Sequence, residues 1–210
     1  MERDTIIHRV RTALGRTATD PPPEPPPPYL RITEWDRAER IRRFTEAQQA
    51  LGGRVYCARG AAAVRAAVCE IVGQREAVLS GDRFLRECGI TGELFSSAAQ
   101  IRAAAEHADV GITGAAYGLA ETGTLVMFAS DTESRLISLL PLVHVSILRV
   151  SALLANLDEL LSRVPNPAEL TSALVMITGP SRTADIEQIL VRGVHGPGEV
   201  HTILADTETE

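Results

Sequence analysis

The sequence predicts an α/β fold with an open, mostly parallel, Rossmann-like sheet flanked by helices. Short apolar runs alternate along the chain with helical patterns, which is the arrangement of βαβ units. The apolar runs contain no regular polar alternation, which indicates strands that are buried on both faces. With 210 residues, 45% of them hydrophobic, the chain is long enough for one domain of this kind.

Residues 1–30 are expected to form an arm outside that domain. Residues 2–16 have an amphipathic pattern, with Ile6, Val10 and Leu14 on one side, which predicts a short helix. Seven of the twelve prolines follow at positions 21–28, where they favour a stiff polyproline II spacer. A helix on such a spacer cannot bury its apolar side locally. We expect it to dock on the domain, on a second protomer in a homodimer or on a partner, or else to stay disordered.

A single domain is expected over residues 31–210. Thr33 and Asp36 resemble a capping box that opens a long helix, and Gly52 and Gly53 stop this helix after Leu51. The same patterns predict the remaining elements. Strands are expected at 54–58, 77–79, 109–113, 124–129, 143–148, 173–178 and 200–204, and helices at 61–72, 97–107, 153–164 and 184–192.

The charged residues exclude several classes of function. The formal net charge of -6 argues against a general nucleic-acid binder, whose affinity comes largely from neutralising phosphates. All 21 cationic residues are Arg. Without lysine the chain cannot form a Schiff base, attach pyridoxal phosphate or build a Walker-type phosphate loop.

The cysteines and the apolar runs exclude further classes of site and of protein. Cys57, Cys69 and Cys88 form no C-x-x-C pair, so we expect neither an iron–sulfur cluster nor a metal site in this chain. The odd number of cysteines favours reduced thiols, and we therefore expect a cytoplasmic protein. The longest apolar region, residues 136–150, is interrupted by Pro141 and Arg149, so no membrane insertion is expected.

Three Gly-rich segments are candidates for a site, because ligands of open α/β sheets bind beyond the carboxyl ends of strands. The first contains Glu121, Thr122, Gly123 and Thr124, directly before a hydrophobic strand. Glu121 there could act as a nucleophile or general base, or it could simply cap a turn or pair with an arginine.

The second segment, residues 178–185, runs from a strand into an expected helix. Ser181 or Thr183 would cap that helix, and its free N–H groups with Arg182 would bind an anion. Alternatively, Arg182 and Asp185 are ordinary solvated charges.

The third segment is the turn at residues 193–198. Its His195 could titrate near neutral pH and act on a ligand, or it could be a plain turn residue. His144 lies in a hydrophobic strand. It could contribute to ligand binding, or it could be a hydrogen-bonded core histidine.

Four stretches taken together, GITGAAYGLAETGTLVMF, LLPLVHVSIL, ITGPSRTADIE and GVHGPGEVH, resemble the lactate-utilisation protein C family, small single-domain members of the LUD group. The resemblance covers residues 31–206. It implies a fold like the sugar-phosphate isomerase and coenzyme A transferase superfamily. It also implies a cytoplasmic role in oxidising L-lactate to pyruvate beside two iron–sulfur partners, which would carry the clusters.

The resemblance also marks individual positions. The residues that match its motifs are Glu121, Thr122, Gly123, Thr124, His144, Gly179, Pro180, Ser181, Arg182, Asp185, Glu187, His195, Gly196 and Pro197. Position 116 is Ala where relatives often carry an acid, which argues against a two-carboxylate mechanism.

Two hypotheses follow. The first is a subunit of a lactate-oxidising system that binds a small anion at Arg182 and the adjoining loop, including Thr183. The second is an enzyme resembling the transferases or isomerases, in which Glu121 attacks an acyl-coenzyme A or moves a proton on a sugar phosphate.

Overall fold

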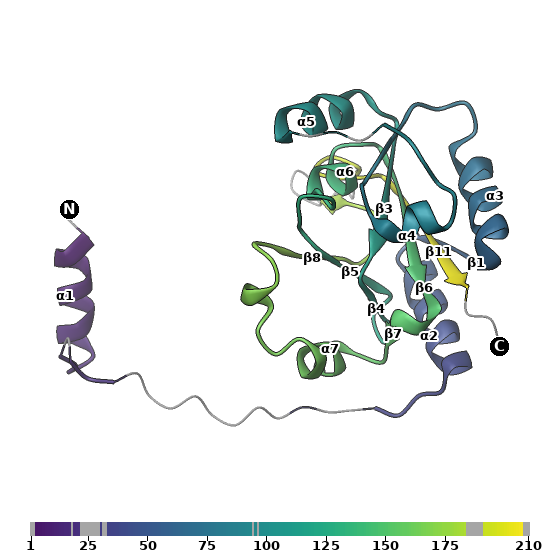
Figure 1. The fold of residues 1–210 in the computed structure, drawn as a ribbon. Coiled ribbons are helices and arrows are strands. Elements are labelled where there is room, and N and C mark those ends of the chain that lie inside the picture. The colour runs from purple at the N-terminus through teal and green to yellow at the C-terminus, as the bar shows by residue number, and fades with distance from the viewer. Residues whose placement is uncertain are drawn as a thin grey trace.

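The central layer of the molecule is a five-stranded parallel sheet (Figure 1). A computed structural model describes residues 3–17, 19–21, 30, 33–93, 95, 97–183 and 191–207. The strands lie in the order β1-β11-β6-β3-β2, and every pairing between them is parallel. Their bounds are Arg54–Arg59 for β1, Glu199–Asp206 for β11, Val143–Arg149 for β6, Val110–Ala115 for β3 and Ala77–Leu79 for β2. The prediction of an open, mostly parallel α/β sheet is confirmed.

Helices cover both faces of this sheet. On one face, α3 (Gly60–Val72) and α4 (Arg83–Glu87) pack in a core cluster with the odd-numbered residues of β6. On the other face, Phe44 of α2 (Arg37–Ala50) packs against Leu148 and Leu204. The helices α5 (Ala98–His107) and α6 (Arg135–Leu139) share a smaller cluster with Val78. The central strands β3, β6 and β11 are therefore buried on both sides, as their apolar runs predict, whereas the edge strand β1 is partly exposed.

A second sheet, which the sequence patterns did not predict, packs on the α2 side. Its order is β7-β4-β5-β8, with bounds Leu153–Leu154, Tyr117–Leu119, Thr124–Phe128 and Leu174–Ile177. β5 is antiparallel to both β4 and β8. The helix expected at 153–164 was wrong in its first turn: residues 153–154 form β7, and α7 runs over Leu157–Arg163. Strands of two and three residues are too short to show a periodicity.

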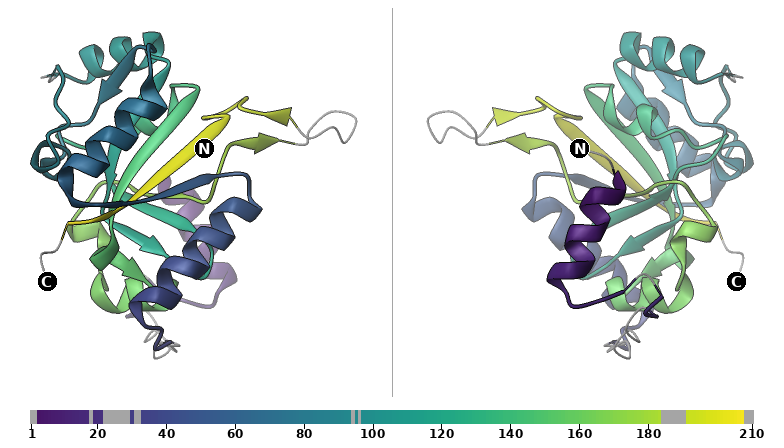
Figure 2. Two further views of the ribbon diagram at one scale, coloured as in Figure 1. Left: turned by 90° about the vertical axis from the view of Figure 1, so that its right-hand side faces the viewer. Right: turned by 90° about the vertical axis from the view of Figure 1, so that its left-hand side faces the viewer.

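The expected helix at 184–192 is also wrong where it can be checked. Val191–Arg192 form β10, which pairs antiparallel with β9 (Arg182–Thr183). Residues 184–190 lie outside the described residues. Figure 2 shows the β9–β10 pair projecting from the domain near the start of β11.

The helix of the arm is present as α1 (Arg3–Ala13), and none of its residues is buried. Figure 1 shows it apart from the two sheets, so its docking stays a prediction. The long helix is capped by Asp36, whose carboxylate accepts from the Glu39 N–H at 2.8 Å, rather than by Thr33. Within the described parts of the chain, no helix is long and apolar enough to cross a membrane.

Candidate functional site

The structure brings the three Gly-rich segments together. The Ser181 N–H donates to the Pro197 carbonyl at 2.8 Å, and the Gly193 N–H donates to the Ser181 carbonyl at 3.0 Å. A hydroxyl chain joins the remaining segment, since the Thr124 hydroxyl lies 2.6 Å from that of Thr122 and 2.9 Å from that of Thr178. We call these three segments the turn cluster (residues 121–124, 178–183 and 193–198).

The C-terminal end of α2 forms the floor of the turn cluster. A Cβ at Gly123, which has a φ of +65°, would lie 2.6 Å from the Gln48 nitrogen, and one at Gly179 would lie 3.1 Å from the Leu51 Cβ. Side chains at these two positions would push the segments away from the helix. The glycines therefore allow the close approach that assembles the cluster.

The turn cluster lies at the amino edge of the central sheet. Residues 121–124 connect β4 to β5 and residues 178–183 follow β8, as expected for segments at strand ends. Residues 193–198, however, precede β11, and the Gly198 N–H donates to the carbonyl of Leu142 just before β6. This third segment lies between two strands, β10 and β11, and it leads into a strand of the central sheet.

Two arginines converge at the cluster. Arg182 and Arg192 are directly opposite partners in the β9–β10 pair. A Cβ at Gly52 would lie 3.2 Å from Nη2 of Arg182 and 3.4 Å from Nη1 of Arg192, so both guanidinium groups reach over the same glycine. Arg182 also donates to the Leu51 carbonyl. Like charges directly opposite each other on a strand pair repel, so an anion between them would relieve this repulsion.

Arg192 also faces a hollow on the sheet side of the cluster. That hollow, of about 450 Å³, lies where β6 and β11 begin. It is lined by Arg75, Asp109, Leu142, Val143, Arg192, Gly193, Gly198 and Glu199. Sequence reasoning missed Arg192, because the segment looked helical. A hairpin pattern would have placed it opposite Arg182.

Among the described residues of this segment, no helix begins. Thr183 lies within β9, and Ser181 precedes that strand. The arginine pair supplies positive charge at the cluster. Asp185 and Glu187 lie outside the described residues.

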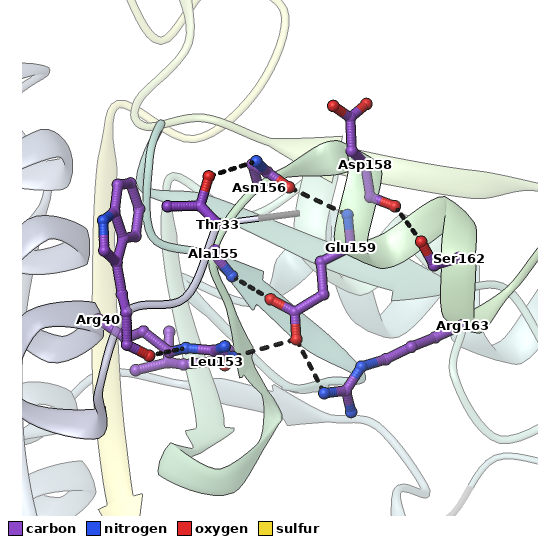
Figure 3. Close-up of polar contacts among 10 residues, drawn as sticks. Thr33, Arg40, Leu153, Ala155, Asn156, Asp158, Glu159, Ser162 and Arg163 are labelled. Atoms are coloured by element: carbon purple, nitrogen blue, oxygen red, sulfur yellow. Dashed lines mark hydrogen bonds and ion pairs between the residues drawn. The ribbon is translucent and has the colours of Figure 1, made fainter. Parts of the chain in front are cut away.

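Glu121 and His195 are both exposed side chains of the cluster. The Glu121 N–H donates to the Ala155 carbonyl at 2.9 Å, which ties its turn to the start of α7. Behind that contact, Glu159 accepts from the Ala155 N–H at 2.7 Å, from Arg163 at 2.8 Å and from Arg40 at 3.2 Å (Figure 3). Burial alone would raise the pKa of Glu159, but these donors outweigh it and hold the pKa below its usual value. Glu159 therefore anchors the turn that carries Glu121.

Comparison with known proteins gives the family. A family model described as the LUD domain matches residues 41–205. The chain belongs to the LUD domain family. "Uncharacterized protein YkgG" of Escherichia coli (strain K12) is 33% identical over 97% of this chain and 98% of that protein.

Other relatives cover less of the chain. "Lactate utilization protein C" of Shouchella clausii (strain KSM-K16) is 41% identical over 49% of this chain, and that of Bacillus subtilis (strain 168) is 41% identical over 48%. The matches span 46% and 43% of those proteins, which is less than half of their length. A crystal structure of a DUF162 family protein from Deinococcus radiodurans has a TM-score of 0.60 with this chain. At 19% identity, covering 82% of this chain and 99% of that one, it shows the fold of this LUD domain.

His144 of this LUD domain lies in the interior and not at the turn cluster. Its side chain is fully buried, and its Nε2 lies 2.8 Å from the Thr113 hydroxyl. Burial lowers its pKa to about 4, and the neighbouring His201 adds to the shift. The register places Thr113, Ser146 and Thr202 side by side on adjacent strands. Of the two interpretations of His144, the structure shows the hydrogen-bonded core histidine.

The row of buried polar side chains Thr113, Ser146 and Thr202 ends at the C-terminal end of α2, beneath the turn cluster. The Thr202 hydroxyl donates to Oε1 of Gln48 at 3.0 Å, and Gln48 is the residue against which Gly123 packs. Among the described residues, no group of three or more His, Cys, Asp or Glu side chains could hold a metal ion.

Proposed function

We propose that this LUD domain is a subunit of a cytoplasmic L-lactate utilisation system that binds a small anionic ligand and acts beside iron–sulfur partner proteins. The pair of Arg182 and Arg192 over Gly52 is the observation that carries the proposal. The relatives named lactate utilization protein C indicate the system.

The arginine pair fits a carboxylate or a phosphate. A guanidinium group presents its N–H donors in a planar fork that matches such an anion in a bidentate manner. Two forks that reach over one glycine leave the floor of the site open, because Gly52 has no side chain to fill it. Lactate and pyruvate are carboxylates of suitable size, and the hydroxyls of Thr122, Thr124 and Thr178 lie in the same cluster.

Thermal unfolding with L-lactate, pyruvate or inorganic phosphate tests the anion site. A ligand at about 100 times its Kd stabilises by roughly 2.7 kcal/mol. At about 2–4 °C of Tm per kcal/mol for a domain of this size, the shift is easily measured. We expect Arg182→Gln and Arg192→Gln each to abolish it. Arg102→Gln is the control, because Arg102 is an exposed arginine that pairs with Glu106 on α5. Anion binding is disproved if no anion raises the Tm, or if the control loses the shift equally.

Affinity purification of the tagged protein from cells grown on lactate tests the assembly. We expect iron–sulfur proteins to co-purify, and deletion of this chain to prevent growth on L-lactate. If the deletion strain grows normally on L-lactate and no iron–sulfur protein co-purifies, the role in lactate utilisation is wrong. The anion site is tested separately by the thermal unfolding experiment.

A second candidate is an enzyme of the coenzyme A transferase or sugar-phosphate isomerase type. The exposed carboxylate of Glu121 favours it, because the Glu121 turn belongs to the same cluster as the arginine pair. In the transferase case Glu121 would attack the thioester carbonyl, and coenzyme A would leave as the thiolate. A Glu121→Gln variant that keeps anion binding and loses turnover of an acyl-coenzyme A would establish this reaction. Unchanged turnover, or none in the parent protein, would exclude it for that substrate.

A further inference from the structure

A second polar site lies at the opposite, carboxyl edge of the central sheet. Ser80, Gly81 and Asp82 follow β2, and the loop at residues 130–134 lies against them. The Gly81 N–H donates to the Thr132 carbonyl at 2.7 Å, and the Ser130 N–H donates to the Glu133 carbonyl at 3.1 Å. The first of these bonds joins the two loops, and the second closes the turn of the loop at residues 130–134. Both loops lie beyond the ends of parallel strands, where α/β sheets bind ligands.

Two carboxylates meet there at Gly114 of β3. A Cβ on Gly114 would lie 2.7 Å from Cγ of Asp82 and 2.8 Å from its Oδ2, so only glycine leaves room for that carboxylate. The Gly114 amide also lies close enough to the Glu133 carboxylate to oppose the rise in its pKa. Asp82 is fixed by the N–H of Phe84, which its Oδ1 accepts at 2.6 Å at the start of α4.

These groups are buried without adequate partners. Glu133 is 8% exposed and Ser80 is 5% exposed. Both carboxylate oxygens of Glu133 and the hydroxyl of Ser80 are buried, and none makes a well-formed hydrogen bond within the described residues. The pKa of Glu133 is raised to about 8, chiefly by burial and also by the negative charge of Asp82, against the opposing effects of Ser80 and the Gly114 amide. A buried carboxylate with so little compensation requires a counter-charge or a proton.

Two arginines near this edge are engaged elsewhere. Arg83, next to Asp82 in the chain, pairs with Glu87 at 2.8 Å. Arg149, at the end of β6, pairs with the same glutamate at 2.7 Å and stacks over the ring of Phe84. Neither compensates Glu133, which leaves a proton or a cation from outside the chain to do so.

We propose that Asp82, Glu133 and Ser80 form a binding site for a hard divalent cation of the Mg²⁺ and Mn²⁺ type. Every donor is an oxygen, which such cations prefer over nitrogen or sulfur donors. Two carboxylates and one hydroxyl are too few for a complete calcium cage. They suit Mg²⁺, which keeps several of its water ligands and is usually held by one or two carboxylates.

A cavity of about 160 Å³ lies next to the two loops. It is lined by neighbours of the donors in sequence, including Gly81, Thr132 and Ser134, and not by Ser80, Asp82 or Glu133 themselves. This site is separate from the turn cluster, and its test does not depend on the proposed function.

Electron paramagnetic resonance of added Mn²⁺ tests the proposal directly, because the signal of free aqueous Mn²⁺ is lost on binding. The full chain at pH 8.5 is titrated with Mn²⁺, and Mg²⁺ is then added as a competitor. We expect one Mn²⁺ per chain, released by Mg²⁺. Glu133→Gln should weaken binding at least tenfold. Glu87→Gln is the matched control, since Glu87 is an exposed carboxylate near the same edge, and it should bind Mn²⁺ as the parent does.

A second variant protects the test against misfolding. Asp82→Asn keeps an oxygen that can cap α4 while removing the charge, so it should fold and still bind Mn²⁺ at least tenfold more weakly. Parent protein that leaves the free Mn²⁺ signal unchanged would overturn the proposal. So would folded Glu133→Gln and Asp82→Asn variants that bind Mn²⁺ as tightly as the parent, which would show an adventitious ion only.

Discussion

Two buried glutamates of this domain have nearly equal exposure and opposite environments. Glu159 is 7% exposed and Glu133 is 8% exposed. Glu159 accepts from the Ala155 N–H and pairs with Arg40 and Arg163, and its pKa is lowered. Glu133 lies beside Asp82, no arginine of the described residues pairs with it, and its pKa is raised to about 8. Burial alone thus does not decide the state of a carboxylate. Its neighbours decide it, and an under-compensated carboxylate marks a place for a ligand.

The comparison predicts opposite effects of the same substitution. Glu159→Gln removes the charge that compensates Arg40 and Arg163, and should lower the free energy of unfolding by about 2 kcal/mol, as for hydrogen bonds to a charged group. Glu133→Gln removes a charge that the fold does not compensate. In a buffer with EDTA at pH 8.5 it should leave the stability unchanged or increase it. Urea unfolding of both variants measures the difference, and equal losses would contradict the comparison.

His144 extends the comparison to a buried base. Its pKa in the folded state is about 4, below the value of about 6.5 expected in the unfolded chain. The unfolded state therefore takes up a proton first as the pH falls, and stability is lost between about pH 6.5 and pH 4. We expect a loss of about 2 kcal/mol between pH 7 and pH 5 that is absent from His144→Gln. His107→Gln, at an exposed histidine on α5, should keep the full pH dependence. A parent protein with the same slope as His144→Gln would show that His144 titrates normally.

The sequence predicts the central sheet well, and for a physical reason. Its central strands are buried on both faces and form nearly continuous apolar runs, and all five strands of the parallel sheet were expected within a few residues of their observed bounds. The short strands β4, β7, β9 and β10 carry too few residues for such a pattern. Their pairing is set by tertiary contacts.

The two sites also differ in how far the sequence predicts them. The three segments of the turn cluster could be recognised from their glycines and prolines, but the sequence did not predict that they meet. Arg192 could not, because only the β9–β10 register places it opposite Arg182. Glu133 lies in a polar stretch, residues 130–135, that resembles an ordinary surface loop. Its burial results from the ends of β2 and β3, which are distant from it in the chain.

Two glycines test how rigid the two edges are. A Cβ at Gly114 would clash with the fixed carboxylate of Asp82, so Gly114→Ala should cost about 1–3 kcal/mol and displace that carboxylate. At the amino edge, a Cβ at Gly198 would lie 3.7 Å from its nearest neighbour, an ordinary contact distance. Gly198→Ala should therefore change the free energy of unfolding by less than about 1 kcal/mol. Chemical denaturation of the two variants is the measurement, and a larger cost at Gly198 would reverse the assignment of the tighter edge.

The smallest effect on stability is expected at the arginine pair, because these side chains are exposed whereas Glu133 is buried. Water screens the repulsion between Arg182 and Arg192, so removing one charge should stabilise the domain by only about 0.5 kcal/mol at low ionic strength. Arg192→Gln should thus raise the Tm slightly in an anion-free buffer, and the gain should shrink as salt is added. Adding phosphate should reverse the order, because the parent gains a ligand that the variant cannot hold. An Arg192→Gln variant that is less stable than the parent without any anion would show that the two guanidinium groups do not repel each other in the folded state. Arg192 would then be a structural residue. The contrast between exposed and buried uncompensated charges would then depend on Glu133 alone.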